Sequence, residues 1–195
     1  MPAMVELRLS HKKREGTPMN KGRIGCTSCL CALAAAVIFG AIALTMPSLA
    51  AAERTFMPDG KFSILFAPEA TIRKTNAGNI VTQTWTGRYD NIYYGVSQSS
   101  SSVPFDAPKE LATNFTNFIA EVHGSIIKQE RRTWPAPRGP VPALRFEFRL
   151  PKGQIGKGVF VVKGGTVFGA VAVDYASPAR DERLSAVVDS LKLLK

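Results

Sequence analysis

Apolar and polar residues alternate along several stretches of the chain, which is the pattern of a strand that buries one face. The clearest stretch is 144–150, where Leu144, Phe146, Phe148 and Leu150 alternate with charged residues. Similar patterns, rich in β-branched and aromatic residues, predict six further strands, at 61–67, 79–89, 92–98, 125–134, 159–163 and 166–174. Short connections at 88–91 and at Gly164-Gly165 predict two hairpins.

Two other stretches repeat apolar residues every three or four positions, the period of an amphipathic helix. The first stripe consists of Leu111, Phe115, Phe118, Ile119 and Val122. We expect Asp106 and Pro108 to begin this helix and Gly124 to end it. The second helix is predicted to begin at Ser177-Pro178 and to bury Leu184, Val187, Val188 and Leu191.

Two polar or proline-rich segments predict loops. They are the serine run Ser99–Ser102 and residues 135–142, where prolines exclude regular structure. The order of elements is therefore three strands, a helix, about four strands and a closing helix. This order indicates an α+β fold, an antiparallel sheet of about six or seven strands with helices on its faces. Residues 53–195 suffice for a single domain with one modest core.

Residues 1–52 have the organisation of an export signal. Basic residues up to Arg23 precede a charge-free apolar stretch, and Pro47 and several small residues follow it. Signal peptidase requires small side chains at two positions, which predicts cleavage after Ala50 or Ala52, and we favour Ala52. Translation starts either at Met1 or at Met19, since residues 19–23 alone form a compact charged start.

The alternative to cleavage is a retained anchor in the inner membrane. Residues 24–46 are long enough and apolar enough to cross the core of a bilayer. Because basic residues precede this segment, residues 53–195 would still face outward. Both interpretations predict an exported domain, periplasmic or extracellular, that meets the membrane only through its N-terminal segment.

All three cysteines, Cys26, Cys29 and Cys31, lie in the leader. The Cys-x-x-Cys spacing lacks a second ligand pair and stands in a segment directed to the membrane, so we predict no metal or redox site. The exported part contains no cysteine, which excludes a disulfide or a thiol nucleophile there.

The exported part also lacks the motifs of common enzyme classes. Its one histidine, His123, falls at a predicted helix end, where a positive imidazole is favoured. No paired-histidine, Gly-x-Ser-x-Gly or phosphate-loop pattern occurs. We therefore predict no catalytic residue, no metal and no cofactor. One alternative is a weak hydrolase in which Glu147, Asp174 and His123 converge in space.

One cluster of side chains is a candidate binding site: Lys128, Arg131, Arg132, Trp134 and Arg138. Guanidinium groups beside an indole can hold phosphates, acidic glycans or carboxylates. The alternative is a solvated strand edge whose charges prevent aggregation. The chain has 25 Lys+Arg against 15 Asp+Glu, and this net charge of +10 suits an anionic envelope surface, while export separates the domain from nucleic acid.

The order of these motifs resembles the PsbP-like superfamily, named after an extrinsic subunit of photosystem II. The resemblance covers roughly residues 55–194 and rests on Phe62–Phe66, Tyr93-Tyr94, the helix at 106–123, 142–148, 158–162 with Gly164-Gly165, and Asp189-Ser190-Leu191. It implies a compact α/β/α sandwich used as an accessory or binding module, generally without catalysis. Leu191 and Phe168 stand where the family has phenylalanine and tyrosine, changes that preserve packing. No motif matches the metal or photosystem contacts of the namesake, so we carry over no functional residue.

These observations lead to one hypothesis and two alternatives. The hypothesis is a non-catalytic exported accessory or binding domain of the bacterial cell envelope, whose partner is an envelope protein or an anionic ligand. The alternatives are the weak hydrolase and a membrane-anchored subunit of a larger complex.

Overall fold

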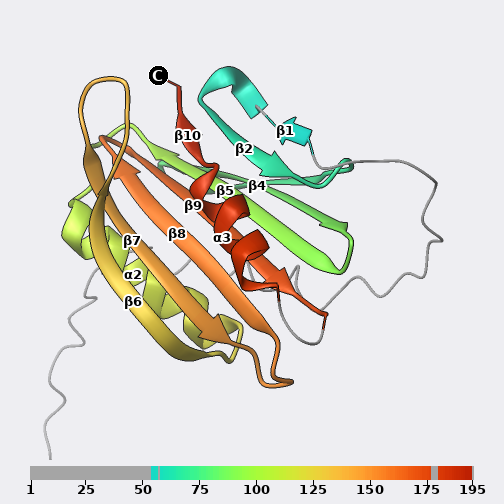
Figure 1. The fold of residues 1–195 in the computed structure, drawn as a ribbon. Coiled ribbons are helices and arrows are strands. Elements are labelled where there is room, and N and C mark those ends of the chain that lie inside the picture. The colour runs from blue at the N-terminus through green and yellow to red at the C-terminus, as the bar shows by residue number, and fades with distance from the viewer. Residues whose placement is uncertain (1–53, 57, 177–179, 195) are drawn as a thin grey trace, which may run out of the picture.

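A computed structural model describes residues 54–56, 58–176 and 180–194 of the chain (Figure 1). Five strands precede the first described helix: β1 (Arg54–Phe56), β2 (Phe62–Phe66), β3 (Thr71–Ala77), β4 (Ile80–Tyr89) and β5 (Ile92–Ser101), with a 3₁₀ turn, η2 (Pro58–Gly60), after β1. Then follow α2 (Ala107–Glu121), β6 (Ser125–Trp134), β7 (Val141–Arg149), β8 (Ile155–Lys163), β9 (Thr166–Asp174), α3 (Asp181–Asp189) and β10 (Lys192–Leu193).

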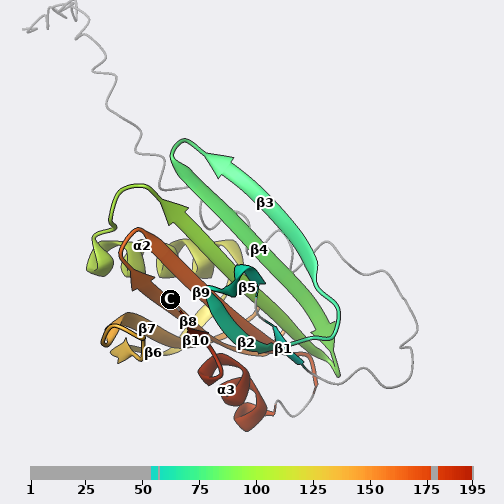
Figure 2. The same ribbon diagram turned by 90° about the horizontal axis from the view of Figure 1, so that it is seen from above.

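The strands form two antiparallel sheets. The large sheet has seven strands in the order β3-β4-β5-β9-β8-β7-β6, and the small sheet has the order β1-β2-β10. Helices α2 and α3 lie on opposite sides of the large sheet (Figure 2). We call these two sides the α2 face and the α3 face. The predicted α+β fold, an antiparallel sheet with helices on its faces, is confirmed.

Each face of the large sheet has its own hydrophobic core. On the α3 face, α3 and the small sheet pack on the large sheet, where Phe62 and Phe66 of β2 contact Trp85, Tyr94 and Phe168 of the large sheet. On the α2 face, the predicted stripe of α2 packs on the phenylalanines of β7 and β8, namely Phe146, Phe148 and Phe160. Burial of these side chains supplies the main driving force for the fold.

Helix α2 begins as predicted but ends differently. The carboxylate of Asp106 accepts a hydrogen bond from the Lys109 amide at 3.4 Å, and Pro108 lies in the first turn. At the other end, Val122 is the C-cap, and His123 adopts the left-handed conformation with φ of 50°. Gly124 has no positive φ, so His123 and not Gly124 makes the turn that ends the helix.

Several strand predictions need correction. The predicted strand at 61–67 is β2, which belongs to the small sheet. The serine run is not a loop, because β5 continues through Ser101 and pairs with both β4 and β9. Strands β1, β3 and β10 were not predicted.

Both predicted hairpins are present. Asp90 and Asn91 have φ of 46° and 60°, so they form a two-residue turn with both residues left-handed between β4 and β5. Gly164, with φ of 57°, provides the left-handed residue between β8 and β9.

The predicted leader with its cysteines and its predicted cleavage sites lies outside the described residues, as does Ser177-Pro178. Helix α3 begins at Asp181, and its first turn contains Asp181 and Glu182. Within the part of the chain that the structure describes, no helix is long and apolar enough to cross a membrane.

Candidate functional site

The predicted basic cluster lies mainly on β6, an edge strand of the large sheet. Strand β6 pairs only with β7, so one of its two edges has no partner strand among the described residues. Every residue from Ser125 to Thr133 is exposed. We refer to this strand as the basic edge, because its exposed charges are Lys128, Arg131 and Arg132 against Glu130.

The register with β7 distributes the cations over both faces. Lys128 lies opposite Glu147 and Arg132 lies opposite Ala143, a core residue of the α3 face. Arg131 lies opposite Leu144, a core residue of the α2 face. Because directly paired residues share a face, Lys128 and Arg132 project on the α3 side and Arg131 on the α2 side.

Acidic residues balance part of this charge on the α3 face. Glu147 lies 3.7 Å from the Lys157 ammonium, which also pairs with Asp181 at 2.6 Å. Glu130 lies opposite Arg145, whose guanidinium pairs with Asp189 at 2.9 Å. Arg131 and Arg132 have no acidic residue opposite them in β7.

Trp134 is a core residue and not part of the exposed surface. Its side chain is only 4% exposed, and its indole N–H donates to the Leu191 carbonyl at 3.0 Å. The Arg132 guanidinium lies 5.5 Å from the centre of the indole ring, so the predicted pairing of guanidinium and indole occurs at a buried indole. Arg138 is exposed in the connection between β6 and β7. The candidate surface therefore consists of the basic edge and Arg138, without Trp134.

The three residues of the hydrolase alternative do not come together. His123 follows α2 and is exposed on that side of the molecule. Glu147 projects from the middle of β7 on the α3 face, and Asp174 ends β9. Each carboxylate already faces cations, Lys157 for Glu147 and Arg180 for Asp174.

Asp174 belongs to a structural ion cluster. It is fully buried and accepts hydrogen bonds from the Ala176 amide at 2.8 Å, the Arg180 amide at 2.8 Å and the Arg180 Nε at 3.0 Å. Burial raises the pKa of the Asp174 carboxyl, but these hydrogen bonds outweigh it and hold the pKa below its usual value. Arg180 also pairs with Asp90, as does Arg183.

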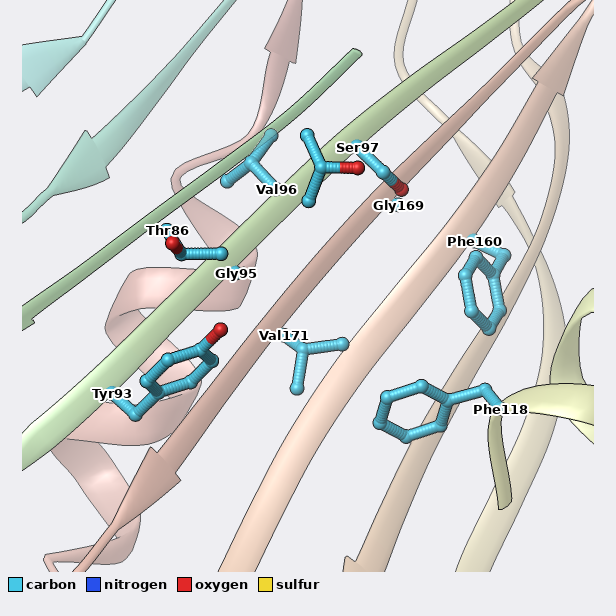
Figure 3. Close-up of a pocket in the computed structure, with 10 residues that line it drawn as sticks. Thr86, Tyr93, Gly95, Val96, Ser97, Phe118, Phe160, Gly169 and Val171 are labelled. Atoms are coloured by element: carbon cyan, nitrogen blue, oxygen red, sulfur yellow. The ribbon is translucent and has the colours of Figure 1, made fainter. Parts of the chain in front are cut away.

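A small hollow lies on the large sheet beside α2, which contributes Phe118 to its lining (Figure 3). Its volume is about 30 Å³, and it is lined by Thr84, Thr86, Tyr93, Gly95, Val96, Ser97, Phe118, Phe160, Gly169 and Val171. Burial raises the pKa of the Tyr93 phenol well above its usual value, and the buried hydroxyl has no hydrogen-bond partner among the described residues. The phenol therefore stays protonated and can only donate or accept a hydrogen bond.

The hollow offers little chemistry. It contains no carboxylate, imidazole or amine. Its volume suits a water molecule or the end of an apolar group. Across the described ranges, no group of three or more His, Cys, Asp and Glu side chains could hold a metal ion. No local pattern predicts this hollow, because its lining combines β4 and β5 with α2, β8 and β9, which follow later in the chain.

Neither a family model nor a curated protein matches the sequence. Among solved structures, the chain is similar to a crystal structure from Bacteroides thetaiotaomicron VPI-5482, with 10% sequence identity and a TM-score of 0.36. The match covers 73% of this chain and 49% of that chain, so the chain spans about half the length of the structure that it matches. A likeness at this level carries no argument about function.

Proposed function

We propose that the chain is a non-catalytic accessory or binding domain, exported to the bacterial cell envelope, which binds an anionic partner at the basic edge. The observation that carries the proposal is the geometry of β6. Its outer edge has no partner strand in the described part of the chain, its cations project on both faces, and two adjacent arginines have no acidic residue opposite them in β7.

Charge complementarity suggests the chemistry of the partner. Arginines at exposed positions attract carboxylates and phosphates, and they steer association more than they add affinity. An envelope protein with acidic residues, or an anionic envelope ligand, fits this surface. The export signal in residues 1–52 supports an envelope location over a role with nucleic acid.

Two further observations support a binding role. The two carboxylates of the hydrolase alternative are engaged in ion pairs of the scaffold, Glu147 with Lys157 and Asp174 with Arg180. The PsbP-like resemblance also implies an accessory module. A retained leader would make the same domain an anchored subunit, with the same binding surface.

The chain offers a matched control for testing this proposal. The other edge of the large sheet, β3, carries the adjacent cations Arg73 and Lys74, which are both exposed. We therefore compare R131Q/R132Q with R73Q/K74Q, since each double variant removes two adjacent edge charges. Substitutions at such exposed positions should change the free energy of unfolding by less than about 1 kcal/mol.

The exported domain is immobilised, and solubilised cell envelope is passed over it. We expect the domain to retain a partner, which salt then elutes. We expect R131Q/R132Q to reduce its retention about tenfold, because two exposed charge contacts contribute about 1 to 2 kcal/mol together. R73Q/K74Q should retain it as the wild type does. Equal retention by all three proteins, or an equal loss in both variants, would contradict a specific role for the basic edge.

A further inference from the structure

We propose that the partner binds the basic edge as an added strand: an extended, acidic segment that pairs with β6 and continues the large sheet. This inference rests on the proposed function and specifies its partner. It differs from simple charge attraction, because main-chain hydrogen bonds along β6 would supply much of the affinity.

The first argument is the outer side of the β6 main chain, which pairs with no strand among the residues that the structure describes. The strand has ten residues, from Ser125 to Trp134, and β7 satisfies its groups on one side only. In an antiparallel sheet, alternate residues of an edge strand direct their N–H and C=O groups away from the sheet. These N–H and C=O groups can form hydrogen bonds with another strand.

The second argument is the absence of cover. Helix α2 packs on β7 and β8, and α3 packs on β8, β9 and β2. The exposure of every residue from Ser125 to Thr133 shows that both sides of β6 project beyond these helices. In Figure 1, β6 accordingly forms the outer margin of the sheet. An added strand would meet no described helix on either face.

The third argument concerns the part of β6 that can pair with an added strand. The register shifts between Ile126 and Lys128, which is a β-bulge that disturbs the start of the strand. The run from Lys128 to Thr133 is regular, and it contains all three cations of the strand. The regular part of the edge is therefore also its charged part.

The positions of the cations on β6 indicate which residues the added segment should contain. Successive residues of a strand point to opposite faces, and Arg131 and Arg132 accordingly flank the edge on the two faces. A segment with two consecutive acidic residues would place one carboxylate on each side. A second copy of this chain would bring the same excess of cations, so electrostatics favours an acidic segment over self-association.

A peptide probe separates strand addition from charge attraction. The probe is a synthetic peptide of about nine residues, built from threonine, valine and paired glutamates. Its first control is the same peptide with alternate amides N-methylated, which keeps the charge but removes the donors on one edge. Its second control replaces glutamate by glutamine. Binding to the exported domain is measured by calorimetry, and protection of β6 amides by hydrogen exchange in NMR.

We expect the acidic peptide to bind and to slow exchange at alternate amides between Lys128 and Thr133. N-methylation should weaken binding about tenfold or more, as the loss of two hydrogen bonds predicts. The glutamine peptide and the R131Q/R132Q protein should each bind about tenfold more weakly, whereas R73Q/K74Q should bind normally.

Four outcomes would overturn the inference. These are equal binding of the N-methylated peptide, protection of β3 instead of β6, no binding of the acidic peptide, and concentration-dependent protection of β6 without peptide, which would identify a second copy as the occupant. The retention experiment with envelope extract decides the proposed function separately. Loss of the partner in R131Q/R132Q with equal binding of the N-methylated peptide would leave a charge-binding surface and reject strand addition.

Discussion

At the scale of single residues, three phenylalanine-glycine pairs shape the core of the α2 face. Phe146 lies opposite Gly158, Phe148 opposite Gly156 and Phe160 opposite Gly169. A Cβ atom at Gly158 would lie 2.4 Å from Phe146 Cζ, and one at Gly156 would lie 2.3 Å from Phe148 Cζ. The rings therefore lie over the glycines.

Gly158→Ala should destabilise the domain, because the new methyl group occupies the space of the Phe146 ring. The expected loss is about 1 to 3 kcal/mol in the free energy of unfolding, the usual cost of overpacking a core. Gly95→Ala is the matched control. It lies in the hollow, where the nearest atom to an added Cβ is Tyr93 Cε1 at 3.5 Å, an ordinary contact.

Urea denaturation measures both variants. We expect Gly95→Ala to be neutral or to stabilise the domain by up to about 1 kcal/mol, since alanine restricts the unfolded chain. A loss of stability in Gly95→Ala as large as that in Gly158→Ala would show that the hollow is not open space.

Trp134 shows what sequence reasoning missed at this scale. Charged residues at 128, 130, 131 and 132 suggested an exposed strand, which is what the structure shows up to Thr133. The burial of Trp134 depends on the Leu191 carbonyl, which is 57 residues away along the chain. A local pattern contains no information about such a contact.

At the scale of elements, the cluster around Asp174 joins three parts of the fold. Asp174 ends β9, Arg180 and Arg183 stand at the start of α3, and Asp90 lies in the turn between β4 and β5. Hydrogen bonds from Arg183 and Arg180 also hold the pKa of the Asp90 carboxyl below its usual value. The cluster therefore fixes α3 against the sheet.

Asp174→Asn should lower the free energy of unfolding by about 2 to 4 kcal/mol at neutral pH, because it leaves Arg180 without its buried partner. The pKa of Asp174 is lower in the folded state than the value of about 3.9 expected for the unfolded chain. Its stabilisation is therefore fully present above that value and is lost as the pH falls through the folded pKa. The difference in the free energy of unfolding between the wild type and Asp174→Asn should therefore become smaller as the pH falls.

Urea denaturation of the wild type and of Asp174→Asn at a series of acid pH values tests whether this difference in stability becomes smaller. The control is Asp189→Asn, which removes only the exposed pair with Arg145 and should cost less than about 1 kcal/mol. A difference for Asp174→Asn that stays constant with pH, or that matches the control, would show that the ionised cluster does not stabilise the fold.

Apolar periodicity predicts strand β7 and helix α2, and the two glycines at 164–165 predict the hairpin of β8 and β9. Polar segments without such a signal were predicted wrongly or missed. The serine run was predicted as a loop, yet Ser99 lies 3.0 Å from the Thr82 hydroxyl across the sheet, and Gln98 is buried. Strand β3 was missed because it is an exposed edge with no apolar alternation.

At the scale of the whole molecule, the closing segment joins the layers. The Asp189 carboxylate pairs with Arg145 of β7, the Ser190 hydroxyl accepts from the Leu65 amide of β2 at 2.8 Å, and the Leu191 carbonyl accepts from Trp134 of β6. These contacts give the Asp-Ser-Leu motif a structural role. Because Trp134 is buried by these contacts, the basic edge up to Thr133 and Arg138 form the part of the predicted site that faces outward.

Site-specific photo-crosslinking in intact cells tests the central claim most directly, because it requires export and partner binding together. A photoreactive amino acid replaces Gln129 on the basic edge in one protein and Lys74 on β3 in another. We expect the envelope fraction to contain a chain lacking residues 1–52, and one reproducible adduct from position 129 that position 74 does not form. A chain confined to the cytoplasm, equal adducts from both edges, or no adduct from position 129 would contradict an exported domain that binds its partner at β6.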